Sequence, residues 1–353
     1  MPARSRSAFP RPITIMPTPL ALARRLLPGL LLAAAAAARA DAQVLRFAEM
    51  DAGTIGRLDR ARTVVVIPGG ILEQHGPLLA VNADGLRNER VAEAVAAGVA
   101  ARPGWTAVIL PTVPLGARGF ETAARRPGFP GSVAVRPSTL QAVFSDLGDA
   151  LAAQGFRHVF VVHGHGDPDH NRALDLAGDY FRDTYGGMMV HLLGRRGCQA
   201  ESVGAPPAAL FGPEAERADA GSPHAGALET ARTWYLRPEL VDSAALRRAP
   251  DVTAPGPDAW AAAARAADWP GYVGAPRHAT LDLGRWIVER EAAGCTELAL
   301  RLLDGADEST IPRYADEMRS IPPVRAMMDE LARADEEQGA RQARWREKAP
   351  ARP

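Results

Sequence analysis

The stretch Thr63-Val64-Val65-Val66-Ile67-Pro68, followed by Gly69-Gly70, decides the fold class of this chain. A short, continuous apolar run that ends in glycine is typical of a strand buried on both faces of a parallel sheet. Similar runs occur at residues 107–110, 158–162 and 188–193. The sequence therefore predicts four buried strands in one sheet.

Helical segments separate these strands. Apolar residues recur at helical spacing over residues 86–101, 138–154 and 173–185, and Ser138 is the expected N-cap of the second segment. This alternation predicts a doubly wound α/β fold, a mostly parallel sheet with helices on both faces in three layers. We expect one such domain over residues 44–330, because no internal repeat divides it.

Composition and charge exclude two classes of protein. The 353 residues are 47% hydrophobic, which rules out disorder as the main state. The 41 basic and 41 acidic side chains balance, so nothing indicates nucleic-acid binding. Cys198 and Cys295 are too few for a disulfide framework, and the sequence leaves open whether they pair.

The N-terminal stretch has the pattern of a secretory signal peptide. Arg24 and Arg25 precede an apolar run at residues 26–37, and a small-x-small cleavage site follows by residue 42. The run is too short to span a bilayer, and no later stretch qualifies as a membrane helix. We expect residues 1–42 to direct the mature protein to the periplasm or outside the cell; a disordered Ala-rich leader is the alternative interpretation.

Two further segments stand out by composition. Residues 249–270 are rich in Ala and Pro and are expected to form a surface excursion. Residues 323–348 are rich in Arg and Glu at helical spacing, so we expect a solvated helical face there. Residues 331–353 accordingly form a charged C-terminal tail in this interpretation.

Potential metal ligands follow the predicted strands. They are Glu73, His75 and Asp84 after the first strand, His163, His165, Asp167, Asp169 and His170 after the third, and His224 and Glu229 later. Ligands of open α/β sheets gather at the carboxyl ends of strands, and mixed carboxylates and imidazoles suit zinc or manganese. The set therefore predicts a metal site, and because one carboxylate can bridge two ions, such a site can hold two metal ions.

Each of these motifs also has an ordinary structural interpretation. Glu73-x-His75 alone is more often an exposed polar loop, and His163 and His165 alone can be loop histidines. Six of the eight histidines fall in loops that face one sheet edge, however, and this co-occurrence favours a metal site. The spacing His163-x-His165-x-Asp167 also suggests a metallo-β-lactamase-type hydrolase, but that pattern requires histidine where this chain has Pro168.

The motifs taken in order resemble the creatininase family of metal-dependent amidohydrolases. The segments that carry this resemblance over residues 63–290 are Ile67-Pro68-Gly69-Gly70-Ile71-Leu72-Glu73-Gln74-His75-Gly76-Pro77 with Asp84, Leu110-Pro111-Thr112, Gly128-Phe129-Pro130-Gly131-Ser132, Phe160-Val161-Val162-His163-Gly164-His165-Gly166, His224-Ala225-Gly226 with Glu229-Thr230, and Gly274-Ala275-Pro276. No single segment is specific, but their order is.

The resemblance implies a site, two cofactors and an assembly. Asp84 would bridge two divalent ions, zinc and/or manganese. Glu73 and His165 would complete one ion site, and His75 and Glu229 the other. His224 would carry a proton near the leaving group, and the family tends to form ring-like homo-oligomers of six chains.

Elementary chemistry leads to the same reaction. Water that bridges two dications becomes hydroxide near neutral pH and attacks an amide carbonyl, while the ions stabilise the oxyanion. The leaving nitrogen needs a proton, which a histidine such as His224 supplies. We expect hydrolysis of a small non-peptide amide, cyclic amide or formamide. The alternative is an exported, catalytically silent metal- or ligand-binding protein.

Departures from the family pattern concern the substrate. Leu78 stands where the family has a second histidine, and Asp167-Pro168-Asp169-His170-Asn171 replaces its Gly-Asn. His163, Asp167, Asp169 and His170 are therefore candidate substrate-binding residues: Asp167 or His170 could add a ligand, and Asp169 could bind a cationic group. The same segment could instead reshape the pocket without contact. Creatinine is not the substrate we expect.

Overall fold

The computed structural model describes residues 43–126, 128–198 and 204–348. The predicted signal peptide lies outside these residues. They contain a five-stranded sheet with the strand order β1(Gln43–Arg46), β3(Thr106–Ile109), β2(Thr63–Pro68), β4(His158–Val162), β5(Met188–His191). All four neighbouring pairs are parallel, which confirms the predicted sheet. The sequence missed β1, a four-residue edge strand with no apolar run.

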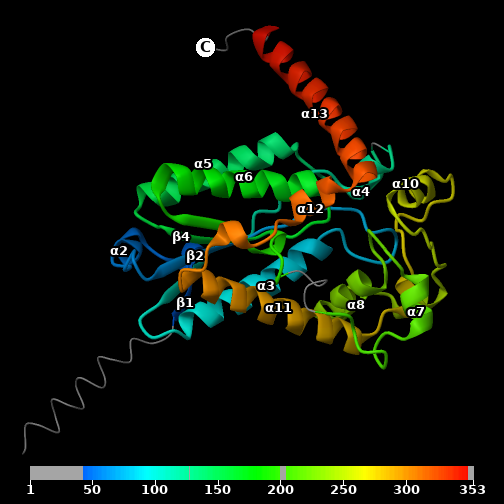
Figure 1. Cartoon of the computed structure of the whole chain (residues 1–353), viewed down its shortest axis with the longest axis horizontal. Helices are drawn as coiled ribbons and strands as arrows, with labels where there is room; N and C mark the ends of the chain where they lie inside the picture. The colour runs from blue at the N-terminus through cyan, green and yellow to red at the C-terminus, as the bar shows by residue number, and fades with distance from the viewer. Residues whose placement is uncertain (1–42, 127, 199–203, 349–353) are drawn as a thin grey trace, which may run out of the picture. The chain divides into compact units, whose positions relative to one another are not determined.

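Helices cover both faces of the sheet, as the alternation predicted (Figure 1). α3(Ala83–Ala100) and α11(Leu281–Leu303) pack on the face that carries Val64 and Val66. α5(Pro137–Ala153) and α6(Pro168–Tyr185) pack on the opposite face, against Val65 and Ile67. Successive residues of a strand point to opposite faces, so a continuous apolar run fills both cores at once.

All three predicted helices begin earlier than expected, α3 at Ala83 and the other two at prolines. α5 begins at Pro137 and its N-cap is Arg136, so the prediction that Ser138 caps this helix is wrong. Proline fits the first helical position because its φ is already helical and it has no N–H to satisfy. α6 begins at Pro168 and Asp167 is its N-cap, so residues 167–171 form a first helical turn.

The remaining elements lie mostly around the carboxyl edge of the sheet and beyond it. They are η1(Phe47–Glu49), α2(Ala52–Gly56), α4(Phe120–Ala123), η2(Leu192–Gly194), α7(Pro213–Ala218), α8(Ala227–Leu236), η4(Pro238–Leu240), α9(Ser243–Arg248), α10(Pro257–Arg265), η5(Pro276–His278), η6(Glu308–Thr310), α12(Tyr314–Ser320) and α13(Pro322–Lys348). α8 packs along α11, and α8 therefore lies on the same side of the sheet as α3 (Figure 1). The excursion at residues 249–270 contains α10.

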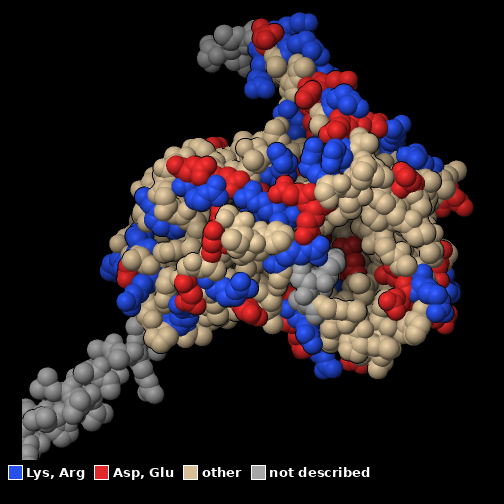
Figure 2. Space-filling model, viewed as in Figure 1, with Lys and Arg blue, Asp and Glu red and all other residues tan. Residues whose placement is uncertain are grey.

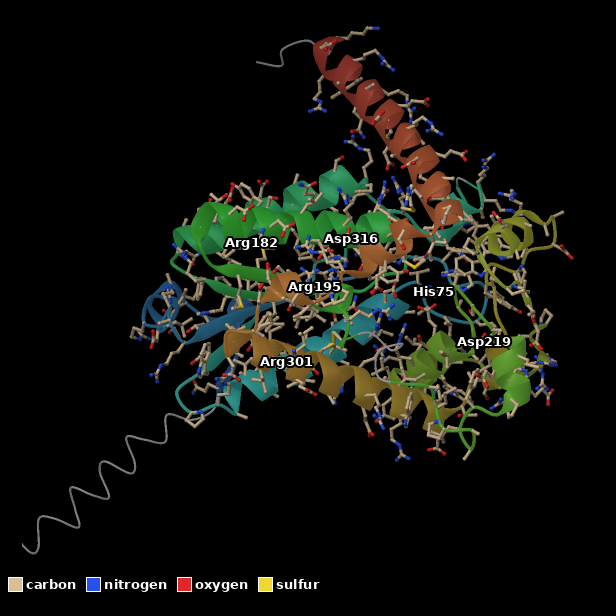
Figure 3. The ribbon with its side chains drawn as sticks, in the orientation of Figure 1. His75, Arg182, Arg195, Asp219, Arg301 and Asp316 are labelled. Carbon is tan, nitrogen blue, oxygen red and sulfur yellow. A yellow bond between two sulfur atoms is a disulfide. The ribbon has the colours of Figure 1, made fainter. Side chains whose placement is uncertain are left out.

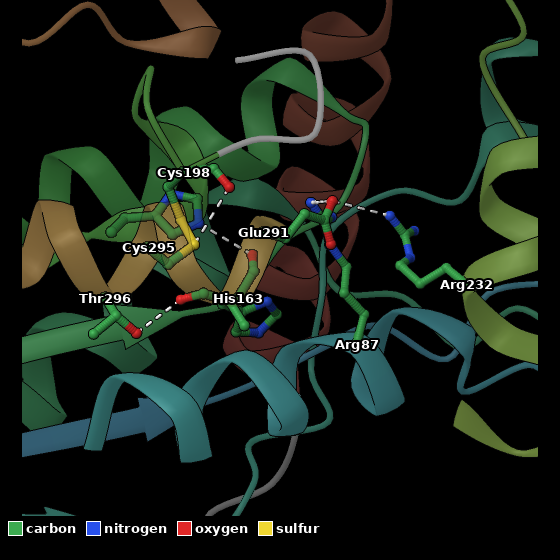
Figure 4. The surroundings of a disulfide bond; sticks show 9 residues. Arg87, His163, Cys198, Arg232, Glu291, Cys295 and Thr296 are labelled. Atoms are coloured by element: carbon green, nitrogen blue, oxygen red, sulfur yellow. Dashed lines mark hydrogen bonds and ion pairs between the residues drawn. A yellow bond between two sulfur atoms is a disulfide. The ribbon is translucent and has the colours of Figure 1, made fainter. Parts of the chain in front are cut away.

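Cys198 and Cys295 form a disulfide in the structure, the pairing that the sequence left open (Figure 4). It joins the segment after η2 to the middle of α11. Within the part of the chain described, no helix combines the length and apolar character needed to cross a bilayer.

Candidate metal centre

The loop after β2 brings the first ligands to the carboxyl edge of the sheet. A Cβ at Gly69 would lie 1.9 Å from the His163 ring, and one at Gly70 would lie 2.8 Å from the Cα of Gly85. Only glycine permits this close approach between the loop and the first turn of α3. Asp84 occupies that turn and therefore lies beside Glu73.

Five side chains from distant parts of the sequence converge here. Glu73, Asp84 and His165 form one group, and His75, Asp84 and Glu229 form a second; within each group the ligand atoms lie within 4.8 Å of one another. Asp84 belongs to both. Figure 3 labels His75, and Figure 2 shows a hollow at the same position with acidic side chains on its floor.

The two histidines of these groups each turn one ring nitrogen toward carboxylates. His165 Nε2 donates to the carbonyl of Arg118 at 2.7 Å, so Nδ1 faces Glu73 and Asp84 at 3.1 and 3.2 Å. His75 Nδ1 donates to the carbonyl of Glu73 at 2.9 Å, and its buried Nε2 has no hydrogen-bond partner among the described residues. A backbone carbonyl that orients a ligating imidazole in this way is typical of metal sites.

The excess of carboxylates over imidazoles in the cluster also suits the binding of cations. Three buried or half-buried carboxylates, from Glu73, Asp84 and Glu229, surround two imidazoles. Despite the opposing effect of burial, Glu229 holds the pKa of His75 at about 9 and Glu73 holds that of His165 well above its ordinary value. Protons thus occupy, in the ion-free protein, the place that divalent cations would take. The donor set fits the implied metals.

Backbone contacts aim the carboxylates. Glu73 Oε1 accepts from the Phe120 amide at 2.6 Å, and Glu229 Oε2 accepts from the Ala225 amide at 2.8 Å. Ala225 and Arg118 adopt φ values of 52° and 54° although neither is glycine. Left-handed backbone at bulky residues costs free energy and clusters at functional sites.

His224 lies beside the two groups in a separate role. Its Nε2 donates to the carbonyl of Gln74 at 2.7 Å, and its Nδ1 lies 3.7 Å from Glu73 Oε1. The Phe120 ring stacks on it with centroids 5.0 Å apart. Burial lowers the pKa of His224, so the ring is neutral at pH 7. It also forms a third group of potential ligands with Glu73 and His75.

The remaining predicted site residues have partners within the protein. Asp167 accepts from the His170 amide as the cap of α6, and burial raises its pKa to about 6. Asp169 pairs with Arg118 at 2.7 Å and with Arg319 at 2.9 Å. His163 and His170 are fully buried behind the ligands and contact Gly70 and Ala117. A substrate-binding role for these four stays a prediction.

Sequence patterns did not reveal several neighbours of the centre. Phe120, Phe129 and Trp269 form a row of aromatic rings beside His224. Arg232 pairs with Glu229 at 3.1 Å and with buried Glu291, which also pairs with Arg87 (Figure 4). Only Arg232, one turn after Glu229 on α8, had a spacing that suggests such a pair.

The fold and the cluster place the chain among α/β proteins that present carboxylates and imidazoles at the carboxyl edge of a parallel sheet. The chain belongs to the creatininase family: the family model described as creatinine amidohydrolase matches residues 48–299. Members of this family are hydrolases. This membership confirms the resemblance drawn from the motifs.

Curated relatives match over part of their length. A mycofactocin precursor peptide peptidase of Mycolicibacterium smegmatis is 36% identical over 107 residues, 29% of this chain and 39% of the relative. A creatinine amidohydrolase of Pseudomonas putida is 28% identical over 102 residues, 29% of this chain and 37% of the relative. The chain thus spans about two fifths of the length of these relatives.

Solved structures show the same fold. A creatininase crystal structure superposes with a TM-score of 0.55 at 21% identity and covers 73% of this chain and 98% of that one. A manganese creatininase gives a TM-score of 0.54 at 20% identity and covers 74% and 99%. Roughly a quarter of this chain therefore has no counterpart in those structures.

Proposed function

We propose that this protein is a metal-dependent hydrolase that cleaves an amide C–N bond at a pair of divalent ions, zinc and/or manganese. The observation that carries the proposal is the pair of carboxylate–imidazole groups that share Asp84, each with one imidazole nitrogen held by a backbone carbonyl and the other facing carboxylate oxygens. Glu73, Asp84 and His165 would hold one ion, and His75, Asp84 and Glu229 the other. When bound, the ions activate water and polarise the amide carbonyl.

The chain's own residues supply orientation and proton transfer. Neutral His224 accepts a proton from the attacking water at Nδ1, since Nε2 is occupied by the carbonyl of Gln74. It then donates that proton to the nitrogen that leaves. Stacking on Phe120 fixes the plane of the His224 ring, and the Phe120 amide fixes Glu73.

The substrate in this proposal is a small non-peptide amide, cyclic amide or formamide. Two curated relatives support C–N cleavage: one is named a creatinine amidohydrolase and the other a peptide peptidase. A peptide bond is thus the closest competing substrate, and the panel that tests the proposal must contain both kinds.

Export is part of the proposal. The N-terminal pattern of residues 1–42 and the Cys198–Cys295 disulfide both suit a protein that works in the periplasm or outside the cell. The proposal also includes a homo-oligomer, the hexamer implied by the family. Light scattering on the purified protein measures the mass of this assembly.

The deciding experiment combines metal content with turnover. We expect two divalent ions per chain, hydrolysis of at least one cyclic amide or formamide, loss of turnover with a chelator and recovery with Mn²⁺ or Zn²⁺. Hydrolysis of peptides alone would contradict the substrate class. Stoichiometric metal with no turnover on either kind of amide would favour the silent binding protein instead.

A further inference from the structure

The elements beyond the family match reach back to the metal centre. The family match ends at residue 299, and α12 and α13, here called the C-terminal extension (residues 314–348), follow it. α12 lies along α6, and the start of α13 lies beside α4 (Figure 1). α6 follows the loop that carries His165, and α4 follows Arg118, whose carbonyl accepts from His165.

Three contacts connect the extension to those loops. Tyr314 Oη donates to the carbonyl of Gly166 at 2.9 Å, next to His165. Arg319 pairs with Asp169 on the first turn of α6 at 2.9 Å. Asp335, on α13, accepts from Arg118 Nε at 3.0 Å and also pairs with Arg118 Nη2.

Two of these contacts lead to Arg118: Asp335 pairs with it directly, and Arg319 pairs with Asp169, which in turn pairs with Arg118. Its side chain is 5% exposed and lies between Asp169 on α6 and Asp335 on α13, with Asp167 Oδ2 3.9 Å from its Nη1. Its backbone is left-handed, with a φ of 54°, and its carbonyl accepts the Nε2 proton of His165. Such a backbone persists only where the surroundings hold it, and the two carboxylates hold it through the guanidinium.

The same segment also aims a second ligand. Two residues after Arg118, the Phe120 amide donates to Glu73 at 2.6 Å. Glu73 and His165 belong to one ligand group, together with Asp84. The other group contains His75 and Glu229, whose backbone partners are Glu73 and Ala225. The extension therefore bears most directly, through Arg118, on the group of Glu73, Asp84 and His165, and it reaches the other group only by way of Asp84 and the Glu73 carbonyl.

We propose that the C-terminal extension is a clamp for the metal centre, in which Asp335 and Arg319 are positioning residues that act through Arg118 and Asp169 on the ion site of Glu73, Asp84 and His165. This inference rests on the proposed function. The Arg118 side chain in the Arg118–Asp335 pair is buried, which distinguishes this contact from an ordinary surface ion pair. The Arg125–Glu330 pair of the same helix is exposed on both sides and contributes little.

Mn²⁺ titration of the full-length protein, followed by electron paramagnetic resonance, tests the clamp. In Asp335→Asn we expect the Mn²⁺ affinity of one of the two sites to fall about tenfold or more. Mutation of a residue that supports a metal ligand typically lowers the metal affinity on this scale. Asp335→Glu should restore most of that affinity, and Glu330→Gln, the matched control, should bind as the wild type does. Arg319→Gln provides a second variant should Asp335→Asn fail to fold.

The outcomes are distinguishable. Two unchanged sites in Asp335→Asn would overturn the clamp and leave the proposed function standing. Equal weakening of both sites, with an equal loss of thermal stability in the metal-free protein, would mean a general structural role and also overturn it. A wild-type protein that binds no Mn²⁺ or Zn²⁺ would overturn the proposed function and this inference together.

Discussion

His75 Nε2 lies 3.6 Å from Glu229 Oε1, beyond hydrogen-bond distance although both atoms are inside the protein. Because His75 donates its Nδ1 proton to the carbonyl of Glu73, the Nε2 atom that faces Glu229 is the one that can give up its proton and offer a lone pair to a cation. A lone pair and a carboxylate oxygen at this separation both fit one cation, at bond lengths of about 2.0–2.2 Å. His165 Nδ1 faces Glu73 and Asp84 in the same way but at the shorter distances of 3.1 and 3.2 Å, and the two arrangements together underlie the two-ion proposal.

Replacing the shared ligand should empty both ion sites. In Asp84→Ala we expect the metal content to fall from two ions per chain to none, because Asp84 belongs to both groups. Glu229→Gln, which touches one group, should retain one ion. Elemental analysis by mass spectrometry on dialysed protein makes the comparison. Retention of one ion and of activity in Asp84→Ala would show that Asp84 is not the bridge.

Loss of the proton carrier should spare the metals. His224→Gln should lower kcat by about 10²–10⁴-fold, the usual contribution of general acid–base catalysis, while the protein keeps both ions. Steady-state kinetics on the substrate found in the panel, with metal analysis of the same sample, checks this. Loss of an ion would instead make His224 a ligand, as its grouping with Glu73 and His75 allows.

Much of the fold and the centre followed from local sequence. β2 and β4 matched their apolar runs because a strand buried on both faces must be continuously apolar. The loops after two parallel strands were predicted to bring Glu73, His75, Asp84 and His165 to one edge, whereas the choice of these four together with Glu229 came from the resemblance to the family. The structure brings these five together.

The clamp had no local signature. Asp335 lies 217 residues from Arg118, so no local pattern connects the two residues. A run of alternating charges predicts a solvated helix and does not reveal that one of its carboxylates has a buried partner. Most of α13 is exposed, as the prediction of a solvated helical face requires, but Val324 and Met328 are buried and Asp335 pairs with Arg118. The left-handed backbone at Arg118 and Ala225 likewise depends on tertiary contacts, since neither residue favours it.

Acid should destabilise the metal-free protein through its buried neutral histidines. Burial lowers the pKa of His163 to about 3 and that of His191 well below its ordinary value. An unfolded histidine titrates near 6.5, so the unfolded state binds more protons below that pH. The free energy of unfolding therefore falls as the pH drops from 6.5, by up to about 1.4 kcal/mol per pH unit for each histidine.

His191→Gln isolates this effect. Asp175, whose pKa burial raises to about 6, contributes a slope of opposite sign in the wild type and in the variant alike. Urea unfolding at pH 6.5 and pH 5 should show a smaller loss of stability in His191→Gln than in the wild type. Equal losses would mean that His191 is not held neutral in the folded protein.

Opening the disulfide should cost stability without emptying the centre. Cys198 and Cys295 are 97 residues apart, and a cross-link over a loop of this length stabilises by about 2–5 kcal/mol. Urea unfolding of Cys198→Ser/Cys295→Ser should show that loss, whereas the single variants would leave a reactive thiol. Two thiols that react in the untreated, unfolded wild type would contradict the pairing.

Anomalous X-ray diffraction from crystals grown with Mn²⁺ tests the two-ion centre most directly. The account predicts two peaks per chain, about 3.5–4 Å apart, with Asp84 bonded to both, Glu73 and His165 to one, and His75 and Glu229 to the other. A single peak, or peaks that Asp84 does not touch, would contradict it.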